Sequence, residues 1–104
     1  MVLVIGRVAC AADKRDELVA ALEKMQDQSR REDGCLRYGF FAAIEDPLSF
    51  VAVEEWADRA ALDRHFAQPH LQEFAGRLLE VVSGQPEVAI HEVAGTQPFP
   101  GSAA

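Results

Sequence analysis

Residues 35–56 read CLRYGFFAAIEDPLSFVAVEEW, two apolar runs separated by a turn signal. The runs at residues 35–44 and 49–56 are rich in the aromatic and β-branched residues that favour strands. Between them, the sequence EDPL at residues 45–48 suits a turn, because proline presets φ at the second turn position. The stretch therefore predicts two consecutive strands joined by a short turn.

Upstream of this stretch, residues 2–10 form a short apolar segment typical of a strand, and a helical pattern follows it. Asp13 is a candidate N-cap, and Gly34 stands just beyond the last turn, as is common at helix C-termini. Spacings of four, three and four place one set of residues on a single helical face: Leu18, Leu22, Met25 and Ser29. The pattern predicts a helix between the first two strands.

Downstream, a second helical region begins after Asp58, another candidate N-cap, and restarts at Pro69, since proline belongs in a first helical turn. Its apolar stripe also contains one histidine; the members are Leu62, His65, Phe66, Leu71, Phe74 and Leu78. Residues 87–93 form the last strand.

The resulting order, β-α-β-β-α-β, predicts the α+β class. With right-handed crossovers it gives a ferredoxin-like fold, an antiparallel four-stranded sheet with the helices on one face. The strand segments at residues 2–5, 40–44 and 50–53 are apolar at successive positions, so both faces of the sheet are apolar. Helices cover only one face, and we therefore expect a homodimer that packs through the other face.

Length and charge exclude several classes of protein. A chain of 104 residues makes one domain, and ten Lys and Arg against seventeen Asp and Glu give a formal net charge of −7. That balance disfavours binding to nucleic acid or to anionic membrane surfaces. No apolar run reaches the roughly 20 residues that cross a bilayer, and no phosphate-binding glycine loop is present.

Residues 1–94 are expected to form the domain, and residues 95–104, rich in Pro and Gly, a tail whose one apolar anchor is Phe99.

Cys10 and Cys35 should lie at opposite edges of the sheet. A disulfide needs Cα atoms within about 7 Å, so we expect free thiols. Two cysteines without a disulfide framework suit the reducing cytoplasm, where we expect the protein.

His65 is the most informative polar residue, because the helical stripe points its imidazole toward the sheet. Imidazole exchanges a proton near neutral pH, so His65 is a candidate acid or base. The alternative is a buried neutral histidine that is bonded to a backbone carbonyl.

A pocket is expected where small strand residues face large side chains, although a core of alternating large and small residues would give the same pattern. The small residues are Gly6, Ala9, Gly39, Ala42, Ala43 and Ala52, and the large ones are Tyr38, Trp56, Phe66 and Phe74.

Other polar groups have simpler interpretations. His70 and Glu73 have the spacing of a metal pair, but no further ligand is evident and no metal site is predicted. Arg7 and Arg37 are expected to pair with a carboxylate such as Glu54 or Glu55. The acidic residues at 32–33 and 45–46 are interpreted as solvated loop charge.

Several motifs, taken in order, resemble the antibiotic biosynthesis monooxygenase (ABM) family and its small quinol monooxygenase-like members. They are SRREDGCLRY at residues 29–38, EDP at 45–47, EEW at 54–56, His65, and Pro69-His70 followed by Phe74. The resemblance extends over residues 2–93. It implies the dimeric α+β barrel, in which the sheet of one ferredoxin-like subunit packs on the sheet of its partner.

The resemblance allows more than one activity. Some members oxygenate polycyclic phenols or quinols without metal or flavin, others degrade haem, and others isomerise a small phosphorylated sugar-like signal. Haem-degrading members carry asparagine, tryptophan and a haem-ligating histidine where this chain has Gly6, His65 and Ala75. Without an axial ligand the iron would not be held, so haem degradation is not expected.

The resemblance favours a cofactor-independent monooxygenase that acts on a phenol or quinol-type molecule with O2. His65 would accept the proton, Arg7 would stabilise the developing oxyanion, and the walls would be Tyr38, Trp56, Phe66 and Phe74. The alternatives are a non-catalytic ligand-binding or stress-associated dimer and an isomerase of a small polar metabolite. A dry aromatic cavity would favour the oxygenase, a cationic cavity the isomerase, and a filled interior mere association.

Overall fold

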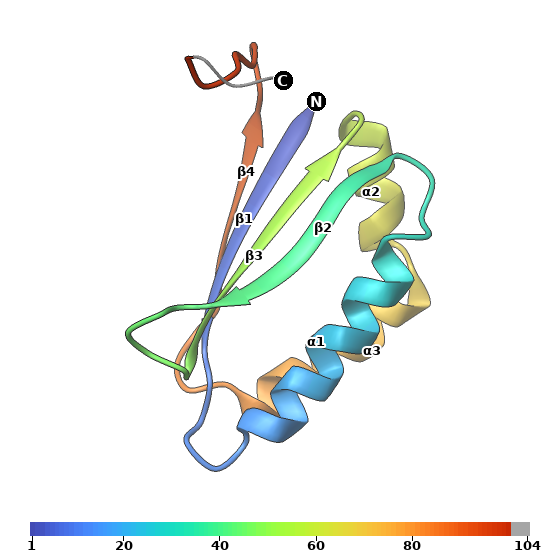
Figure 1. The fold of residues 1–104 in the computed structure, drawn as a ribbon. Coiled ribbons are helices and arrows are strands. Elements are labelled where there is room, and N and C mark those ends of the chain that lie inside the picture. Colours follow the sequence, from blue (N-terminus) through green and yellow to red (C-terminus); the bar gives the residue numbers. More distant parts are fainter. Residues whose placement is uncertain (101–104) are drawn as a thin grey trace.

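The computed structural model describes residues 1–100 and shows one antiparallel sheet covered by helices (Figure 1). The sheet order is β2-β3-β1-β4, and each neighbouring pair is antiparallel. This is the ferredoxin-like arrangement that the sequence predicts. The elements are β1 (Val2–Ala9), α1 (Arg15–Ser29), β2 (Cys35–Ala42), β3 (Ser49–Trp56), α2 (Arg59–Phe66), α3 (Pro69–Val81) and β4 (Glu87–Glu92).

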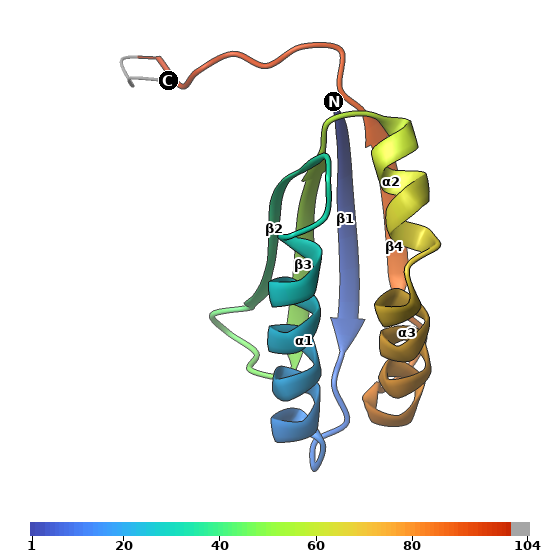
Figure 2. The ribbon, with the colours of Figure 1, turned by 90° about the vertical axis from the view of Figure 1, so that its right-hand side faces the viewer.

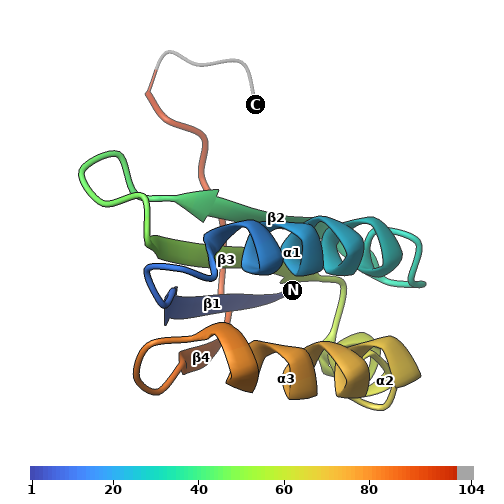
Figure 3. The same ribbon diagram turned by 90° about the horizontal axis from the view of Figure 1, so that it is seen from below.

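All three helices lie on one face of the sheet (Figure 2). Helices α1 and α3 run alongside each other along the strands and contact one another, and α2 continues the line of α3 (Figure 3). The core between the layers contains fully buried apolar side chains, among them Leu18, Met25, Trp56, Leu62 and Val81. The candidate site lies between this layer of helices and the sheet.

Strand β3 alternates strictly between its two faces. Phe50, Ala52, Glu54 and Trp56 are buried beneath the helices, and the residues between them are half-buried on the opposite side. Following the pairing register, we define the open face of the sheet by its large apolar members: Leu3, Ile5, Phe41, Val51 and Val53. The open face is the second apolar surface that the strand composition predicts.

The ends of the elements agree with the expected capping at most positions. The Asp58 side chain accepts a hydrogen bond from the Ala61 backbone N–H at 2.8 Å, and Pro69 is the first residue of α3. Gly34 has φ +86°, a conformation that glycine adopts without strain. The expectation for Asp13 is wrong, because α1 begins one residue later and Lys14 occupies the N-cap position.

Three further boundaries differ slightly from the expected ones. Strand β2 ends at Ala42, β1 at Ala9 and β4 at Glu92, so the residues expected to extend them lie just outside. Ile44 in particular is fully exposed. Strand ends depend on the pairing partner rather than on local composition, and β3 begins only at Ser49, which pairs with Ala9.

Both cysteines are free, as expected. Burial raises the pKa of the Cys10 thiol. It also raises the pKa of Cys35 to about 11, where the charges of Glu32 and Glu54 act in the same direction, so neither thiol is activated.

Residues 95–100 contain no helix or strand, and the rest of the expected tail, 101–104, lies outside the described residues. In residues 1–100 no helix is long and apolar enough to span a membrane.

Candidate functional site

A cavity of about 240 Å³ lies between the helices and the sheet. Strands β1, β2, β3 and β4 and helices α1, α2 and α3 all contribute to it. Small residues from the strands, Gly6 and Ala52, leave the space, and the walls are predominantly apolar: Val4, Val8, Leu22, Phe40, Phe66, Leu71, Phe74, Leu78 and Val88. The pocket expected from small strand residues beneath large side chains is therefore present.

The polar groups at the cavity wall include Tyr38, Glu54 and His65, supplied by β2, β3 and α2. Glu54 is only 8% exposed, and burial raises the pKa of its carboxyl group to about 7. The nearby charge of Glu32 acts in the same direction, and the hydrogen bond from Trp56 opposes it. Near neutral pH a fraction of Glu54 is therefore uncharged and able to donate a proton.

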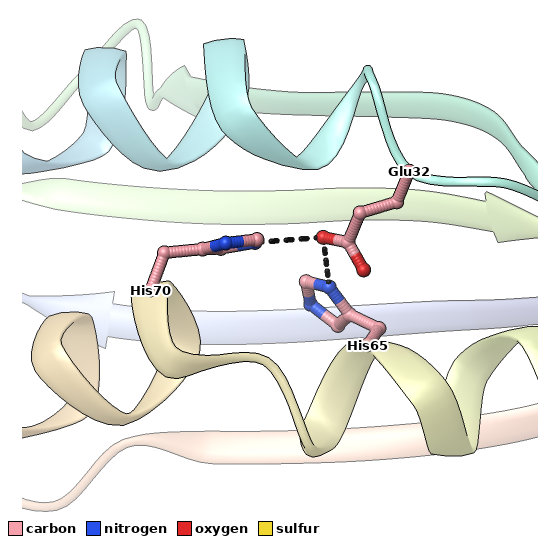
Figure 4. A group of neighbouring side chains, drawn as sticks. All are labelled: Glu32, His65 and His70. Atoms are coloured by element: carbon pink, nitrogen blue, oxygen red, sulfur yellow. Dashed lines mark hydrogen bonds and ion pairs between the residues drawn. The ribbon is translucent and has the colours of Figure 1, made fainter.

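His65 is 1% exposed and is held by a carboxylate from the opposite side of the helical layer. Its Nδ1 lies 2.8 Å from Oε2 of Glu32, which belongs to the loop between α1 and β2 (Figure 4). Because a carboxylate only accepts hydrogen bonds, we assign the ring hydrogen to Nδ1. Nε2 then carries the lone pair, and it faces Glu54 Oε1 at 3.9 Å.

The electrostatics keep His65 neutral. Burial lowers the pKa of its imidazole, and the Glu32 hydrogen bond and charge oppose that shift without reversing it. The adjacent His70 lowers the pKa further. A neutral imidazole with Nε2 free at a cavity wall is the form of histidine that accepts a proton.

His70 shares the same carboxylate oxygen. Its Nε2 lies 2.8 Å from Glu32 Oε2, and it comes from the first turn of α3 (Figure 4). These ligand types suit a transition metal, and among the described residues they form the one cluster of three groups close enough to hold an ion. Both rings donate to the same carboxylate oxygen, however, so Glu32 Oε2 already has two hydrogen-bond partners within the cluster.

Trp56 contacts both Glu54 and His65 on the side away from the cavity. Its Nε1–H donates to Glu54 Oε1 at 3.0 Å, and its ring lies 4.5 Å from that of His65, centroid to centroid. Trp56 is completely buried and is not among the residues that line the cavity. Its position is that of a support for Glu54 and His65 rather than that of the wall the sequence suggested.

Of the remaining expected site residues, three line the cavity, and the side chain of Arg7 lies on the opposite face of the sheet. Tyr38, Phe66 and Phe74 line the cavity together with His65. Arg7 also borders the cavity, but it is exposed. Since Gly6 faces inward, strand alternation places the side chain of Arg7 on the open face. The alternation does not support contact between the Arg7 guanidinium and a molecule in this cavity.

One expectation for a charged residue is wrong. Glu32 is not solvated loop charge, since its side chain is only 10% exposed between the two histidines. Glu73, whose spacing from His70 would suit a metal pair, forms an ion pair with Lys24 at 3.3 Å. Both partners come from distant parts of the chain, so local spacing carried no information about them.

The pairing of Arg37 with Glu55, at 3.6 Å, is confirmed. Glu54 lines the cavity and faces His65 instead of pairing with an arginine. Its position on the covered face could have been predicted from the sequence. Glu54 has the same strand parity as the buried Phe50, Ala52 and Trp56, which places a carboxylate on the covered face.

A family model for antibiotic biosynthesis monooxygenases matches residues 1–77. The chain belongs to the antibiotic biosynthesis monooxygenase family. A similar curated relative is "Uncharacterized protein sll1783" of Synechocystis, 33% identical over 96 residues, which are 92% of this chain and 65% of that relative. Another is "Putative monooxygenase Rv0793" of Mycobacterium tuberculosis, 33% identical over 82 residues, covering 79% of this chain and 80% of that protein.

Solved structures of this family share the fold. The structure of Rv0793 from Mycobacterium tuberculosis superposes with a TM-score of 0.86 at 28% identity, covering 93% of this chain and 98% of that one. A crystal structure of an antibiotic biosynthesis monooxygenase gives a TM-score of 0.85 at 28% identity over 91% of this chain and 100% of the other. The ABM scaffold therefore surrounds the cavity described above.

Proposed function

We propose that this ABM protein is a cofactor-independent monooxygenase that acts on a small neutral phenol or hydroquinone, with His65 as the base. One observation carries the proposal. His65 lines an apolar cavity, its Nε2 faces the Glu54 carboxyl group at 3.9 Å, and its Nδ1–H is anchored on the carboxylate of Glu32. A base, a carboxylate that orients it and an apolar cavity that holds the ring are the groups that deprotonation of a bound phenol requires.

The expected chemistry begins with proton transfer from the ligand hydroxyl to His65 Nε2. The imidazolium that forms is stabilised by Glu32, which lies at hydrogen-bond distance on the other ring nitrogen. A deprotonated hydroquinone is electron-rich enough to pass an electron to O2, so the ligand itself supplies the redox chemistry. Phe66 and Phe74 offer apolar surfaces on which a flat ring can rest.

The character of the cavity favours this function over the isomerase alternative. A phosphorylated or carboxylated metabolite needs cationic groups, and among residues 1–100 the one arginine that lines the cavity, Arg7, has the strand parity of the open face. Glu54 adds an acidic group instead. Gly6 and Ala75, which stand where haem-degrading members are expected to carry asparagine and the haem-ligating histidine, also border the cavity and offer no ligand atom.

The test is oxygen uptake by metal-stripped protein with 1,4-dihydroxynaphthalene, after the protein-free rate has been subtracted. We expect turnover by the native protein and a loss of about 10²–10⁴-fold in His65→Gln, the range of general base catalysis. The control is Glu23→Gln, which changes an exposed residue on α1, away from the cavity and from the open face. Circular dichroism verifies folding. Tight ligand binding without oxygen uptake across a panel of hydroquinones would favour the non-catalytic alternative.

The same proposal includes a homodimer through the open face of the sheet. Phe41 is 56% exposed there, beside the half-buried Leu3, Ile5, Val51 and Val53. A contiguous apolar surface of this kind is typical of an interface. Light scattering should give a dimer for the native protein and a monomer for Phe41→Glu. The control Leu79→Glu changes an exposed apolar residue on α3 and should remain dimeric.

A further inference from the structure

We propose that Glu54 is a second catalytic group, a neutral carboxylic acid that protonates the peroxide formed when O2 adds to the bound ligand. The inference rests on the proposed function and extends it, because His65 alone accounts only for the removal of the first proton. It stands on where Glu54 lies, what holds it and which atom it faces.

The carboxyl group of Glu54 is buried at the cavity wall. It is supplied by β3, on the face covered by the helices, and is 8% exposed. Within residues 1–100, no lysine or arginine lies within 4.0 Å of it to form an ion pair. A carboxylate that is removed from water without a cation is costly, and this environment favours the protonated acid.

Trp56 fixes the orientation of the acid. Its indole N–H donates to Glu54 Oε1, so the acid's own proton is assigned to Oε2. The indole ring also packs against the His65 imidazole at 4.5 Å between centroids. One buried side chain therefore positions both the acid and the base.

Acid and base lie side by side at the cavity wall. Glu54 Oε1 and His65 Nε2 are 3.9 Å apart, which is too far for a direct hydrogen bond. A ligand hydroxyl that donates to His65 Nε2 therefore lies beside the Glu54 carboxyl group. The proton on Glu54 Oε2 is then available to a second oxygen atom bound next to that hydroxyl.

The proton count closes for a naphthohydroquinone. His65 takes the hydroxyl proton from 1,4-dihydroxynaphthalene, the anion transfers one electron to O2, and the two radicals form a C–O bond at the adjacent ring carbon. Glu54 protonates the terminal oxygen of the resulting peroxide anion. The Glu54 carboxylate then removes the C–H proton as the O–O bond breaks, and the departing hydroxide takes the proton from His65. The products are 2-hydroxy-1,4-naphthoquinone and one water, and both groups regain their initial states.

Without the acid, the peroxide anion either dissociates back to the two radicals or releases its two oxygen atoms as hydrogen peroxide. The hydroquinone is then oxidised to 1,4-naphthoquinone, and O2 leaves as hydrogen peroxide. The two outcomes consume the same O2 but give different products. The ratio of hydroxyquinone to hydrogen peroxide therefore reports on Glu54, and a merely structural role would not change it.

The experiment compares native protein, Glu54→Gln and the control Glu23→Gln, an exposed carboxylate on α1, with 1,4-dihydroxynaphthalene as the probe. Native protein and Glu23→Gln should give mainly 2-hydroxy-1,4-naphthoquinone. Glu54→Gln should lower the ratio of hydroxyquinone to hydrogen peroxide at least about tenfold, because general acids contribute about 10²–10⁴-fold. An unchanged ratio in folded Glu54→Gln overturns the inference about Glu54. Absence of hydroxyquinone from the native protein instead overturns the proposed function.

A second variant gives a test if Glu54→Gln fails to fold. Trp56→Phe keeps an aromatic ring and removes the N–H that favours the ionised form of Glu54. The charged and titratable groups that bear on Glu54 are Glu32, Tyr38 and His65. Removing the N–H raises the pKa of Glu54, so the acid stays protonated to a higher pH. The pH at which the ratio of hydroxyquinone to hydrogen peroxide falls should therefore be higher in Trp56→Phe than in the native protein. An unchanged or lower pH would contradict the assignment.

Discussion

Replacing Glu32 tests whether the buried carboxylate controls His65. Two variants separate its roles. Glu32→Gln retains an oxygen that accepts hydrogen bonds from both imidazoles, but it removes the charge. Glu32→Ala removes the acceptor as well and leaves the Nδ1–H of His65 without its partner at 2.8 Å.

The expected magnitudes follow from burial. The His65 ring is 1% exposed, so Glu32→Ala leaves a donor that water reaches poorly, at a cost of about 1–3 kcal/mol in the free energy of unfolding. The donor on His70, 17% exposed, is solvated more easily and adds little. Glu32→Gln should cost less than about 1 kcal/mol, because the hydrogen bonds persist.

The effect on activity should be ordered differently. The Glu32 charge raises the pKa of His65, so removing that charge lowers the pKa further and weakens the base. Glu32→Gln should therefore lose most of the oxygen uptake with 1,4-dihydroxynaphthalene while keeping nearly native stability in urea unfolding. Native stability and native uptake in Glu32→Ala would refute the proposed control of His65 by Glu32.

The remaining predictions concern stability and its pH dependence. Gly34→Ala should lose roughly 2–5 kcal/mol in urea unfolding, because φ is +86° and a Cβ would lie 2.5 Å from the Ala61 Cβ. Gly76→Ala, inside α3 with no neighbour within 4 Å of the added Cβ, should instead gain up to about 1 kcal/mol; equal effects at the two sites would contradict the geometry. The pKa of Glu54 rises from the ordinary 4.5 to about 7 in the folded protein, so the stability from its neutral form is present at low pH and is lost as the pH rises through that interval. The difference in unfolding free energy between native protein and Glu54→Gln should fall by on the order of 3 kcal/mol across it, and a flat difference would show that Glu54 titrates normally.

The fold was predictable because its determinants are local or periodic. The helical stripe that contains Leu62, His65 and Phe66 and the apolar strand runs specify which surfaces must be buried. The element order then leaves few topologies. Boundaries were less accurate, as at Asp13, because a helix start depends on which residue first adopts helical geometry.

The site was predictable only in part. His65 was found from its position on the buried stripe, and Glu54 was detectable from its strand parity. Glu32 was not, because its burial depends on a contact with His65 across 33 positions of the chain, and with His70 across 38. A charged residue in a loop is usually solvated, and nothing in its neighbourhood distinguishes this one.

The central claim is that His65 is a neutral base with its lone pair on the nitrogen that faces Glu54 at the cavity wall. Nitrogen-15 NMR of the histidine rings, with two-bond couplings to the ring protons, measures this tautomer in the ligand-free protein. At pH 7 we predict a proton on Nδ1 of His65 and none on Nε2. A proton on Nε2, alone or together with one on Nδ1, would contradict the account.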